Sequence, residues 1–205
     1  QEATLSKYLS DLSNGACRPL QVRIRTRITM ATTARTEAPA QGASSWVERA
    51  RALGPMIDAA AQANEEATEL APEVWQAIQD AGLFSIMIPK AAGGGEVHPV
   101  EQIDVIAELS YWDGSTGWYG HAVMTGGGVA GAFLGDSAIA QVFPGGLYTH
   151  CSGQVAPSGK AERVGDHYRV SGRYSFATGS PRANWLVGGY LLHDKGEQVL
   201  DENGQ

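Results

Sequence analysis

Apolar residues recur at helical spacing from residue 45 onward. The first set falls at i, i+4, i+7, i+11 and i+14: Trp46, Ala50, Leu53, Ile57 and Ala60. This spacing places one apolar stripe along a helix that begins at about Ser45. Because proline has no backbone N–H, Gly54-Pro55 is expected to bend or restart this helix.

Further helices are predicted downstream. Pro72 stands where a first-turn proline belongs, and Gly82 is expected to end that helix in left-handed backbone. Pro99 begins another helix, and Asp136 can cap a short one. Between these two, residues 119–134 are mostly small, so this helix allows close contact with a neighbouring helix or with a flat ligand.

The glycine-rich stretch Ala91–Glu96 allows two interpretations. A phosphate cradle is one, because glycines let the backbone approach an anion closely. The stretch lacks the Lys-Ser/Thr pair of a phosphate loop and a preceding parallel strand. A surface turn is therefore the favoured interpretation.

From Leu147 the apolar period changes to that of strands. Strands are predicted over residues 148–155, 160–164, 168–178 and 185–192, and turns over residues 156–159, 165–166 and 179–181. In the third strand Phe176 and Thr178 would share the inward face. There the ring can lie against a flat ligand while the hydroxyl hydrogen-bonds to the ligand's edge.

These patterns predict an α+β protein. A helical domain is expected over residues 45–145, followed by the start of a β-domain over residues 146–205. Residues 1–44 are predicted to be a leader that is disordered or non-native, with Met30 as the natural start. A basic targeting arm is the alternative.

Composition limits the partners. With 15 basic and 22 acidic residues, the net charge of −7 offers no footprint for nucleic acid or an anionic membrane surface. No run of about eighteen apolar residues occurs, so no membrane span is predicted. Cys17 and Cys151 are far apart and, like the histidines, lack metal-ligand spacing. We therefore expect no metal site and a cytoplasmic location.

Two motifs carry a family resemblance. One reads Asp113-Gly-Ser-Thr-Gly-Trp118, and the other reads Gly172-Arg-Tyr-Ser-Phe-Ala-Thr-Gly179. They resemble the acyl-CoA dehydrogenase superfamily, and more closely its flavin-dependent monooxygenase (hydroxylase) branch, over about residues 45–192. The resemblance implies an N-terminal all-helical domain followed by an antiparallel β-barrel-like domain that is incomplete here. The family's C-terminal helical bundle is absent, so we expect an N-terminal fragment.

The resemblance also implies residues that bind FAD or FMN. Phe176 falls on the aromatic residue that lies beside the isoalloxazine ring. Thr178 falls on the hydroxyl residue that bonds near flavin N5, although Ala177 stands where hydroxylases often place the first of two serines. Ser152 and Gly179 are further candidates for the cofactor site.

Other residues are candidates for the substrate side. Trp118 and Ser152 would line the substrate pocket. His121 follows on the same helix and is a candidate catalytic base, with a purely structural histidine as the alternative.

The activity implied by the resemblance is that of a reduced-flavin-dependent monooxygenase, a hydroxylase of a small aromatic or polycyclic substrate. A separate flavin reductase would supply the reduced flavin, and the whole protein would form a homotetramer. Acyl-CoA dehydrogenases carry Thr-Glu-Pro-x-x-Gly-Ser where this chain has Cys151-Ser-Gly-Gln-Val-Ala-Pro-Ser158. That difference disfavours dehydrogenation at the CH–CH group of an acyl thioester, the first alternative. An inactive truncated fragment is the second.

Overall fold

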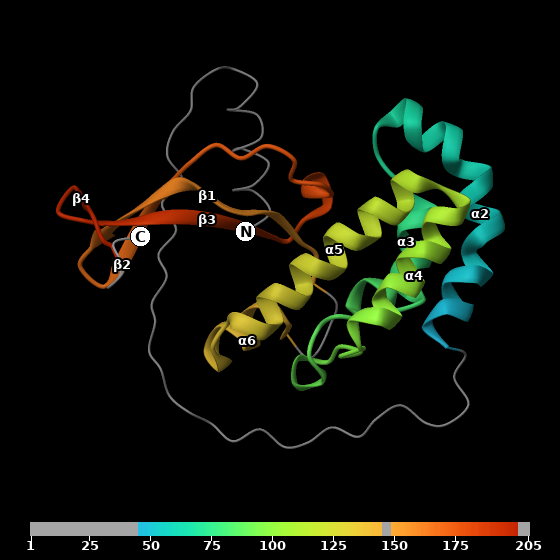
Figure 1. The fold of residues 1–205 in the computed structure, drawn as a ribbon, viewed down its shortest axis with the longest axis horizontal. Helices are drawn as coiled ribbons and strands as arrows, with labels where there is room; N and C mark the ends of the chain where they lie inside the picture. The colour runs from blue at the N-terminus through green and yellow to red at the C-terminus, as the bar shows by residue number, and fades with distance from the viewer. Residues whose placement is uncertain (1–44, 145–148, 201–205) are drawn as a thin grey trace. The chain divides into compact units, whose positions relative to one another are not determined.

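The computed structural model describes residues 45–144 and 149–200 (Figure 1). Its helices are α2 (Trp46–Ala67), α3 (Pro72–Asp80), α4 (Pro99–Trp112), α5 (Gly114–Phe133) and α6 (Asp136–Val142), with short 3₁₀ helices η1 (Leu83–Ser85), η2 (Lys90–Ala92) and η4 (Ser180–Arg182). Its strands are β1 (Cys151–Val164), β2 (His167–Ser171), β3 (Trp185–Asp194) and β4 (Glu197–Gln198). The predicted leader and Met30 lie outside the described residues.

Contacts within the chain divide it into two compact units. Of the described residues, the helical unit comprises residues 45–144, 149–155 and 175–187, and the strand unit comprises residues 156–174 and 188–200. β1 and β3 each continue from one unit into the other. All the predicted site residues belong to the helical unit: Trp118, His121, Ser152, Phe176, Thr178 and Gly179.

α2 begins where the sequence predicts. Ser45 and Glu48 form a reciprocal capping box, in which each side chain accepts a hydrogen bond from the other residue's backbone N–H, at 3.2 and 2.8 Å. Of the two alternatives predicted at Gly54-Pro55, the restart of the helix is wrong, because α2 runs through these residues to Ala67, and the bend stays a prediction. Gly54 is buried directly against the indole of Trp112 in α4, and this packing holds the helix together where proline removes a hydrogen bond.

The ends of the next helices follow local signals with one exception. Pro72 lies in the first turn of α3, and Gly82 adopts a φ of 75° directly after it, so both predictions are confirmed. The prediction that Asp136 caps α6 is wrong. The cap position is Gly135, and Asp136 lies in the first helical turn, where its charge favours the helix dipole.

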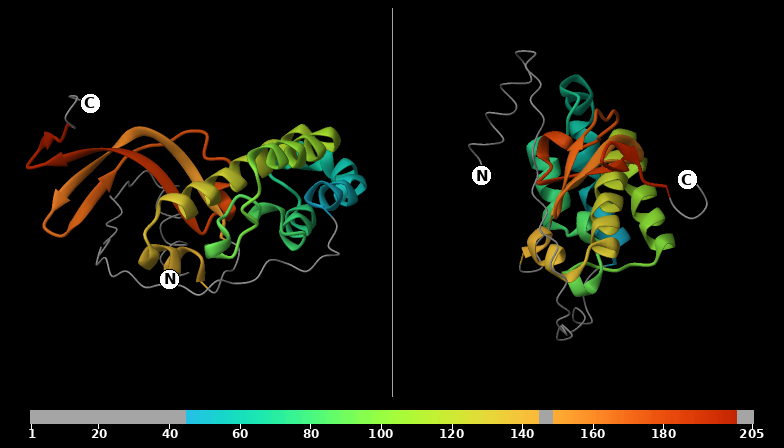
Figure 2. Two further views of the ribbon diagram at one scale, coloured as in Figure 1. Left: turned by 60° about the horizontal axis from the view of Figure 1, so that its bottom comes forward. Right: turned by 90° about the vertical axis from the view of Figure 1, so that its left-hand side faces the viewer.

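One apolar core organises the helical unit. α4 packs against both α2 and α5 (Figure 2). The core's large, fully buried side chains are Ile57, Val74, Ile78, Leu83, Phe84, Ile86, Val105, Leu109, Val123 and Met124. Each such side chain contributes about 1.5–3 kcal/mol relative to an exposed position. The same core fixes α5, which carries Trp118 and His121.

The small residues of α5 serve close packing against protein. A Cβ on Gly127 would press on Ile88, and one on Gly131 would collide with Pro89. On another side of the helix, a Cβ on Gly126 would collide with the carbonyl oxygen of Cys151 at the start of β1. At these three positions the close neighbour is not a helix; the predicted contact with a neighbouring helix occurs at Gly120, where a Cβ would lie 3.2 Å from Leu109 of α4.

The predicted surface turn at residues 91–96 is confirmed. Glu96 folds back so that its carboxylate accepts a hydrogen bond from the backbone N–H of Lys90, at 2.7 Å. This negative group occupies a donor that a phosphate would need. The alternative of a phosphate cradle therefore loses its support.

The strands form one sheet in the order β2-β1-β3-β4. β1 pairs antiparallel with β2, from Lys160 opposite Ser171 to Val164 opposite His167, and β3 pairs antiparallel with β4. Within the described residues the sheet is open. The expected fold class, a helical region followed by a β region, is confirmed.

Two details of the strand prediction are wrong. No turn separates residues 148–155 from 160–164, because β1 runs through Pro157, whose missing N–H a strand tolerates at unpaired positions. The third strand ends at Ser171 and does not reach Thr178. The chain leaves extended backbone there, and Phe176 takes a positive φ of 62°. Phe176 and Thr178 therefore do not share the inward face of a strand.

Candidate functional site

The motif at residues 113–118 builds the start of α5. The carboxylate of Asp113 accepts hydrogen bonds from the backbone N–H groups of Ser115 and Thr116, at 3.3 and 2.8 Å, and from the Thr116 hydroxyl at 2.6 Å. Thr116 is fully buried, and Gly117 packs against Ser110 of α4. This N-cap fixes the first helical turn and thereby the position of Trp118.

Trp118 links α5 to the segment after β2. Its indole Nε1–H donates to the hydroxyl oxygen of Thr178 at 3.2 Å, across 60 residues of sequence. A threonine hydroxyl has one hydrogen to donate and two lone pairs to accept with. Because Trp118 uses one lone pair, the Thr178 O–H stays available to donate to a ligand.

Ser152 holds the backbone of the same residue. Its hydroxyl donates to the Thr178 carbonyl oxygen at 2.6 Å, and Ser152 is almost fully buried. Two of the predicted residues, Trp118 and Ser152, thus converge on a third, Thr178. Because the Ser152 hydroxyl donates its one hydrogen in this bond, its role is to orient the backbone of Thr178.

Gly179 follows in a conformation that requires glycine. Its φ is 78°, and a Cβ would lie only 2.7 Å from Nε2 of His150. Both the backbone and the packing therefore exclude a side chain. The tight contact sets the path of the chain directly after Thr178.

His150 was not predicted as part of this region. It is fully buried among the rings of Trp75, Phe84 and Tyr119, at centroid distances of 6.5, 6.4 and 5.8 Å. Burial, and to a smaller degree the charge of Arg182, lowers the pKa of His150 to about 4. The imidazole is therefore neutral near pH 7. No local signal marks it, because its neighbours come from three separate elements.

Phe176 lies on the surface of the helical unit. Its side chain is 91% exposed, and its φ of 62° is unfavourable for a residue with a Cβ. Such strain costs roughly 1 kcal/mol or more and is found most often at functional positions. The ring is thus presented outward two residues before Thr178.

His121 lies beside Trp118 on α5. The two ring centroids are 5.6 Å apart, and Nδ1 of His121 lies 3.4 Å from the hydroxyl of Thr125. This contact occupies Nδ1. A substrate group would therefore meet His121 at Nε2.

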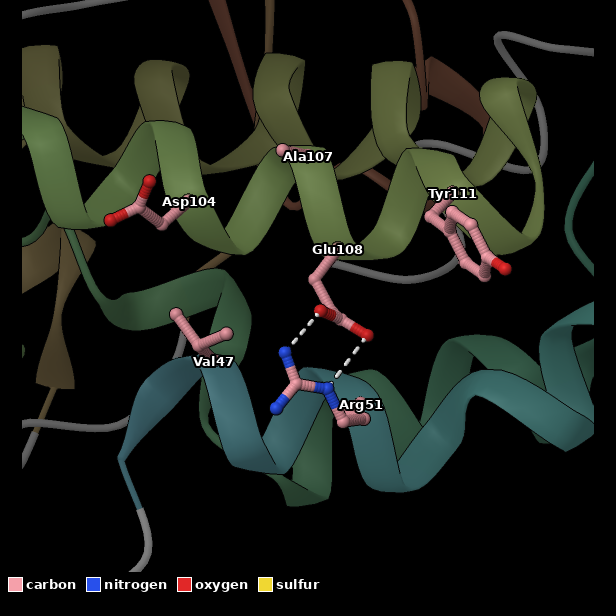
Figure 3. A pocket seen from close by; sticks show the side chains of 6 residues that line it. All are labelled: Val47, Arg51, Asp104, Ala107, Glu108 and Tyr111. Carbon is pink, nitrogen blue, oxygen red and sulfur yellow. Dashed lines mark hydrogen bonds and ion pairs between the residues drawn. The ribbon is translucent and has the colours of Figure 1, made fainter.

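An open pocket lies elsewhere, between α2 and α4 (Figure 3). It has a volume of about 410 Å³ and is lined by Val47, Arg51, Asp104, Ala107, Glu108 and Tyr111. The Arg51 guanidinium donates two hydrogen bonds to the Glu108 carboxylate, at 3.2 and 2.8 Å, which lowers the pKa of Glu108. The pocket contains no predicted site residue, and the Arg51 guanidinium is already paired with the Glu108 carboxylate.

Among residues 45–144 and 149–200, no three histidine, cysteine, aspartate or glutamate side chains gather closely enough to hold a metal ion. The helices in this part of the chain are all too short or too polar to cross a membrane.

Known proteins resemble the chain over most of its described length. Residues 48–137 match the family described as acyl-CoA dehydrogenase, N-terminal domain. The oxygenase subunit HsaA of a flavin-dependent monooxygenase from Mycobacterium tuberculosis (strain H37Rv) is 31% identical over 69% of this chain and 36% of HsaA. The oxygenase component of an FADH(2)-dependent resorcinol hydroxylase from Rhizobium sp. (strain MTP-10005) is 29% identical over 71% of this chain and 36% of that protein.

Solved structures agree. The crystal structure of 3-HSA hydroxylase from Rhodococcus sp. RHA1 superimposes with a TM-score of 0.72 at 25% identity, over 76% of this chain and 41% of that one. The expected similarity to the acyl-CoA dehydrogenase superfamily, on the side of its flavin-dependent monooxygenases, is confirmed. The chain spans well under half the length of these relatives.

Proposed function

We propose that this chain, which carries the N-terminal domain of the acyl-CoA dehydrogenase superfamily over residues 48–137, acts within a flavin-dependent monooxygenase that hydroxylates a small aromatic compound. One observation carries the proposal: Trp118 and Ser152 both bond to Thr178 and leave its O–H free to donate. The names of the relatives, a flavin-dependent monooxygenase and a resorcinol hydroxylase, support the same reaction. The proposed domains remain 45–145 and 146–205.

The residues present suit a reduced flavin, either FAD or FMN. A flavin offers a flat ring system with hydrogen-bonding atoms along its edge. Phe176 presents an exposed ring for the flat face, and Thr178 presents a hydroxyl donor for the edge near N5. Gly179 keeps the backbone between them and the core free of side-chain bulk. Ser152 orients Thr178 from beneath.

When bound, reduced flavin supplies the two electrons with which one oxygen atom of O₂ enters an aromatic C–H bond while the other leaves as water. The chain's own residues position and shield this chemistry. Trp118 holds the Thr178 hydroxyl in one orientation and presents its ring, 62% exposed, to an aromatic substrate. His121 would accept the proton of a substrate hydroxyl at Nε2, which raises the electron density of the aromatic ring.

The proposed partners follow from this reaction. A separate flavin reductase would supply the reduced flavin, and the substrate would be a small aromatic or polycyclic molecule. The complete protein would be a homo-oligomer, with a homotetramer as our prediction, and a cytoplasmic location stays a prediction. The dehydrogenase alternative needs a glutamate base, which the C-terminal half of such an enzyme would have to supply.

The test mixes the purified protein with photoreduced FMN or FAD and a phenol, admits oxygen, and follows the flavin's visible absorbance and the products. We expect a delayed return of oxidised flavin compared with free flavin, and a hydroxylated phenol. Thr178→Val, which is similar in shape but has no O–H, should shorten the delay and divert oxygen to hydrogen peroxide.

The controls separate the proposal from its alternatives. Ser137→Ala removes an exposed hydroxyl in α6 of the same unit, away from Thr178 and His121, and should leave the delay unchanged. Reoxidation at the rate of free flavin, with bleaching of oxidised flavin by an acyl-CoA, would instead establish a dehydrogenase. Failure to bind either flavin in any redox state would contradict the proposal.

A further inference from the structure

The segment from Thr178 to Asn184 is held at both ends. At its start, the Ser152 hydroxyl donates to the Thr178 carbonyl. At its end, the Asn184 backbone N–H donates to the His150 carbonyl at 2.9 Å, and the Asn184 side-chain oxygen accepts from the His150 N–H at 3.2 Å. We call residues 178–184 the anchored turn. Because β1 supplies Ser152 and the residue before β1 is His150, both ends are tied to one short stretch.

Arg182 ties the middle of the anchored turn to a different place. Its Nε donates to the Glu69 carboxylate at 2.7 Å, and its Nη2 donates to the Leu70 carbonyl at 2.9 Å. Its guanidinium also lies 5.4 Å from the ring centroid of Trp75. Glu69 and Leu70 form the corner between α2 and α3, more than a hundred residues earlier in the chain.

This contact is stronger than an ordinary surface ion pair. The Arg182 side chain is only 22% exposed, so its charge is partly shielded from water. It uses two nitrogens of its planar fork for two acceptors, and one of these bonds is charge-assisted at both ends. The Leu70 carbonyl lies where α2 has ended and α3 has not begun, so Arg182 provides a partner for a backbone group outside the helices.

From this geometry we infer that Arg182 is a positioning residue for flavin binding. Its hydrogen bonds hold the anchored turn against the corner between α2 and α3, and this keeps the Thr178 hydroxyl within hydrogen-bonding distance of the Trp118 indole. The inference rests on the proposed function of Thr178 as a flavin contact. Glu69 is part of the same contact, because its carboxylate is the negative charge that pairs with the Arg182 guanidinium.

Hydrogen exchange tests, without any cofactor, whether Arg182 holds the anchored turn in place. In Arg182→Gln the amides of Ser180 and of residues 182–185 should exchange about tenfold faster than in the wild type, because local opening no longer breaks the contacts to Glu69 and Leu70. Arg51→Gln is the matched control, since it removes another Arg–Glu pair of the helical unit (Figure 3) and should leave these amides unchanged. Unchanged exchange in Arg182→Gln would overturn the inference.

Flavin titration tests the consequence for binding. Arg182→Gln should raise the Kd of anaerobically reduced FMN or FAD about fivefold to tenfold. Arg182→Lys should restore part of this loss, because lysine keeps the charge but not the fork. The double variant Arg182→Gln/Glu69→Gln should be no worse than Arg182→Gln alone, because the two residues act as one pair.

The outcomes are distinguishable. If the wild type binds reduced flavin and Arg182→Gln binds it equally well, this inference is wrong and the proposed function stands. Additive losses in the double variant would also overturn it. If the wild type binds no reduced flavin, the proposed function fails and the inference fails with it.

Discussion

The indole Nε1–H of Trp118 donates to the hydroxyl of Thr178 at 3.2 Å, and this bond joins the two motifs that carry the family resemblance. One motif starts α5 and the other follows β2, so neither could report on the other from sequence alone. Their meeting point lies in one compact unit. The two motifs therefore serve one site, in which the first orients the hydroxyl that the second supplies.

Replacing Trp118 by phenylalanine tests this relationship. Trp118→Phe keeps an aromatic ring but removes the only N–H that the side chain has, so the Thr178 hydroxyl loses its fixed orientation. We expect a loss of about 1 kcal/mol, or roughly fivefold, in affinity for reduced flavin. Anaerobic titration with FMN or FAD measures it.

Trp112→Phe is the matched control for this substitution. It also removes an indole N–H, one that lies 3.4 Å from the Glu108 carboxylate and does not contact Thr178. Its flavin affinity should equal that of the wild type. Equal losses in both variants would mean that indole packing in general, and not the bond to Thr178, controls binding.

Local signals predicted most element starts and ends correctly. The predicted helix ends are found at Ser45, Pro72 and Gly82. A cap, a first-turn proline and a left-handed glycine depend only on the neighbouring backbone, so the local sequence is enough to predict them. The same holds for Asp113, which begins α5. The family resemblance added the prediction that Thr178 and its neighbours are site residues.

What the sequence could not predict depends on distant contacts. Pro55 stays within α2 because Trp112, from another helix, packs against the adjacent glycine. The alternation of inward and outward residues up to Thr178 predicts extended backbone and gives no sign of the left-handed backbone at Phe176. His150 gives no signal in its own segment, since its aromatic surroundings come from α3, η1 and α5.

Gly179 should tolerate no side chain. Gly179→Ala combines an unfavourable φ of 78° with a Cβ placed 2.7 Å from His150 Nε2. We expect a loss of about 2–4 kcal/mol in the free energy of unfolding, measured by urea denaturation. Gly165→Ala isolates the backbone part, because its φ is 62° with nothing within 4 Å, and should cost only about 1 kcal/mol. Similar losses in the two variants would show that the contact with His150 is not tight.

Phe176 should show opposite effects on stability and binding. Phe176→Gly relieves the positive φ and loses almost no buried surface, because the side chain is 91% exposed. We expect it to raise the free energy of unfolding by about 0.5–1 kcal/mol while weakening the binding of reduced flavin. Phe176→Ala keeps the strain and loses the ring, so it should weaken binding without the gain in stability. A Phe176→Gly variant that binds as tightly as the wild type would remove Phe176 from the site.

Asp113 should contribute more to stability than an ordinary first-turn acid. Asp113→Ala removes three hydrogen bonds at the start of α5 and is expected to cost about 1–2 kcal/mol in thermal unfolding. Asp113→Asn keeps a capping oxygen and should cost less. Asp136→Ala, in a first turn without capping bonds, should change stability by about 0.5 kcal/mol or less. If Asp136→Ala costs as much as Asp113→Ala, charge and not capping is the cause.

His150 should make the protein sensitive to acid. Its pKa is about 4 in the folded chain, while an unperturbed histidine has a value of 6.5. Between these two values the unfolded chain binds more protons than the folded one, so stability falls as the pH falls. The expected loss from His150 is about 2 kcal/mol between about pH 7 and about pH 5, measured by urea denaturation at each pH.

A variant without the titrating group identifies the source of this loss. His150→Phe keeps a ring in the aromatic cluster and cannot be protonated, so the share of the acid sensitivity that comes from His150 should disappear, whatever its stability at neutral pH. His167→Phe changes a partly exposed histidine in the strand unit and should keep the loss that comes from His150. If His150→Phe loses stability toward pH 5 as steeply as the wild type, the imidazole is not held neutral by its surroundings. In that case Gly179 would pack against a charged ring, and the close contact beneath the anchored turn would need another explanation.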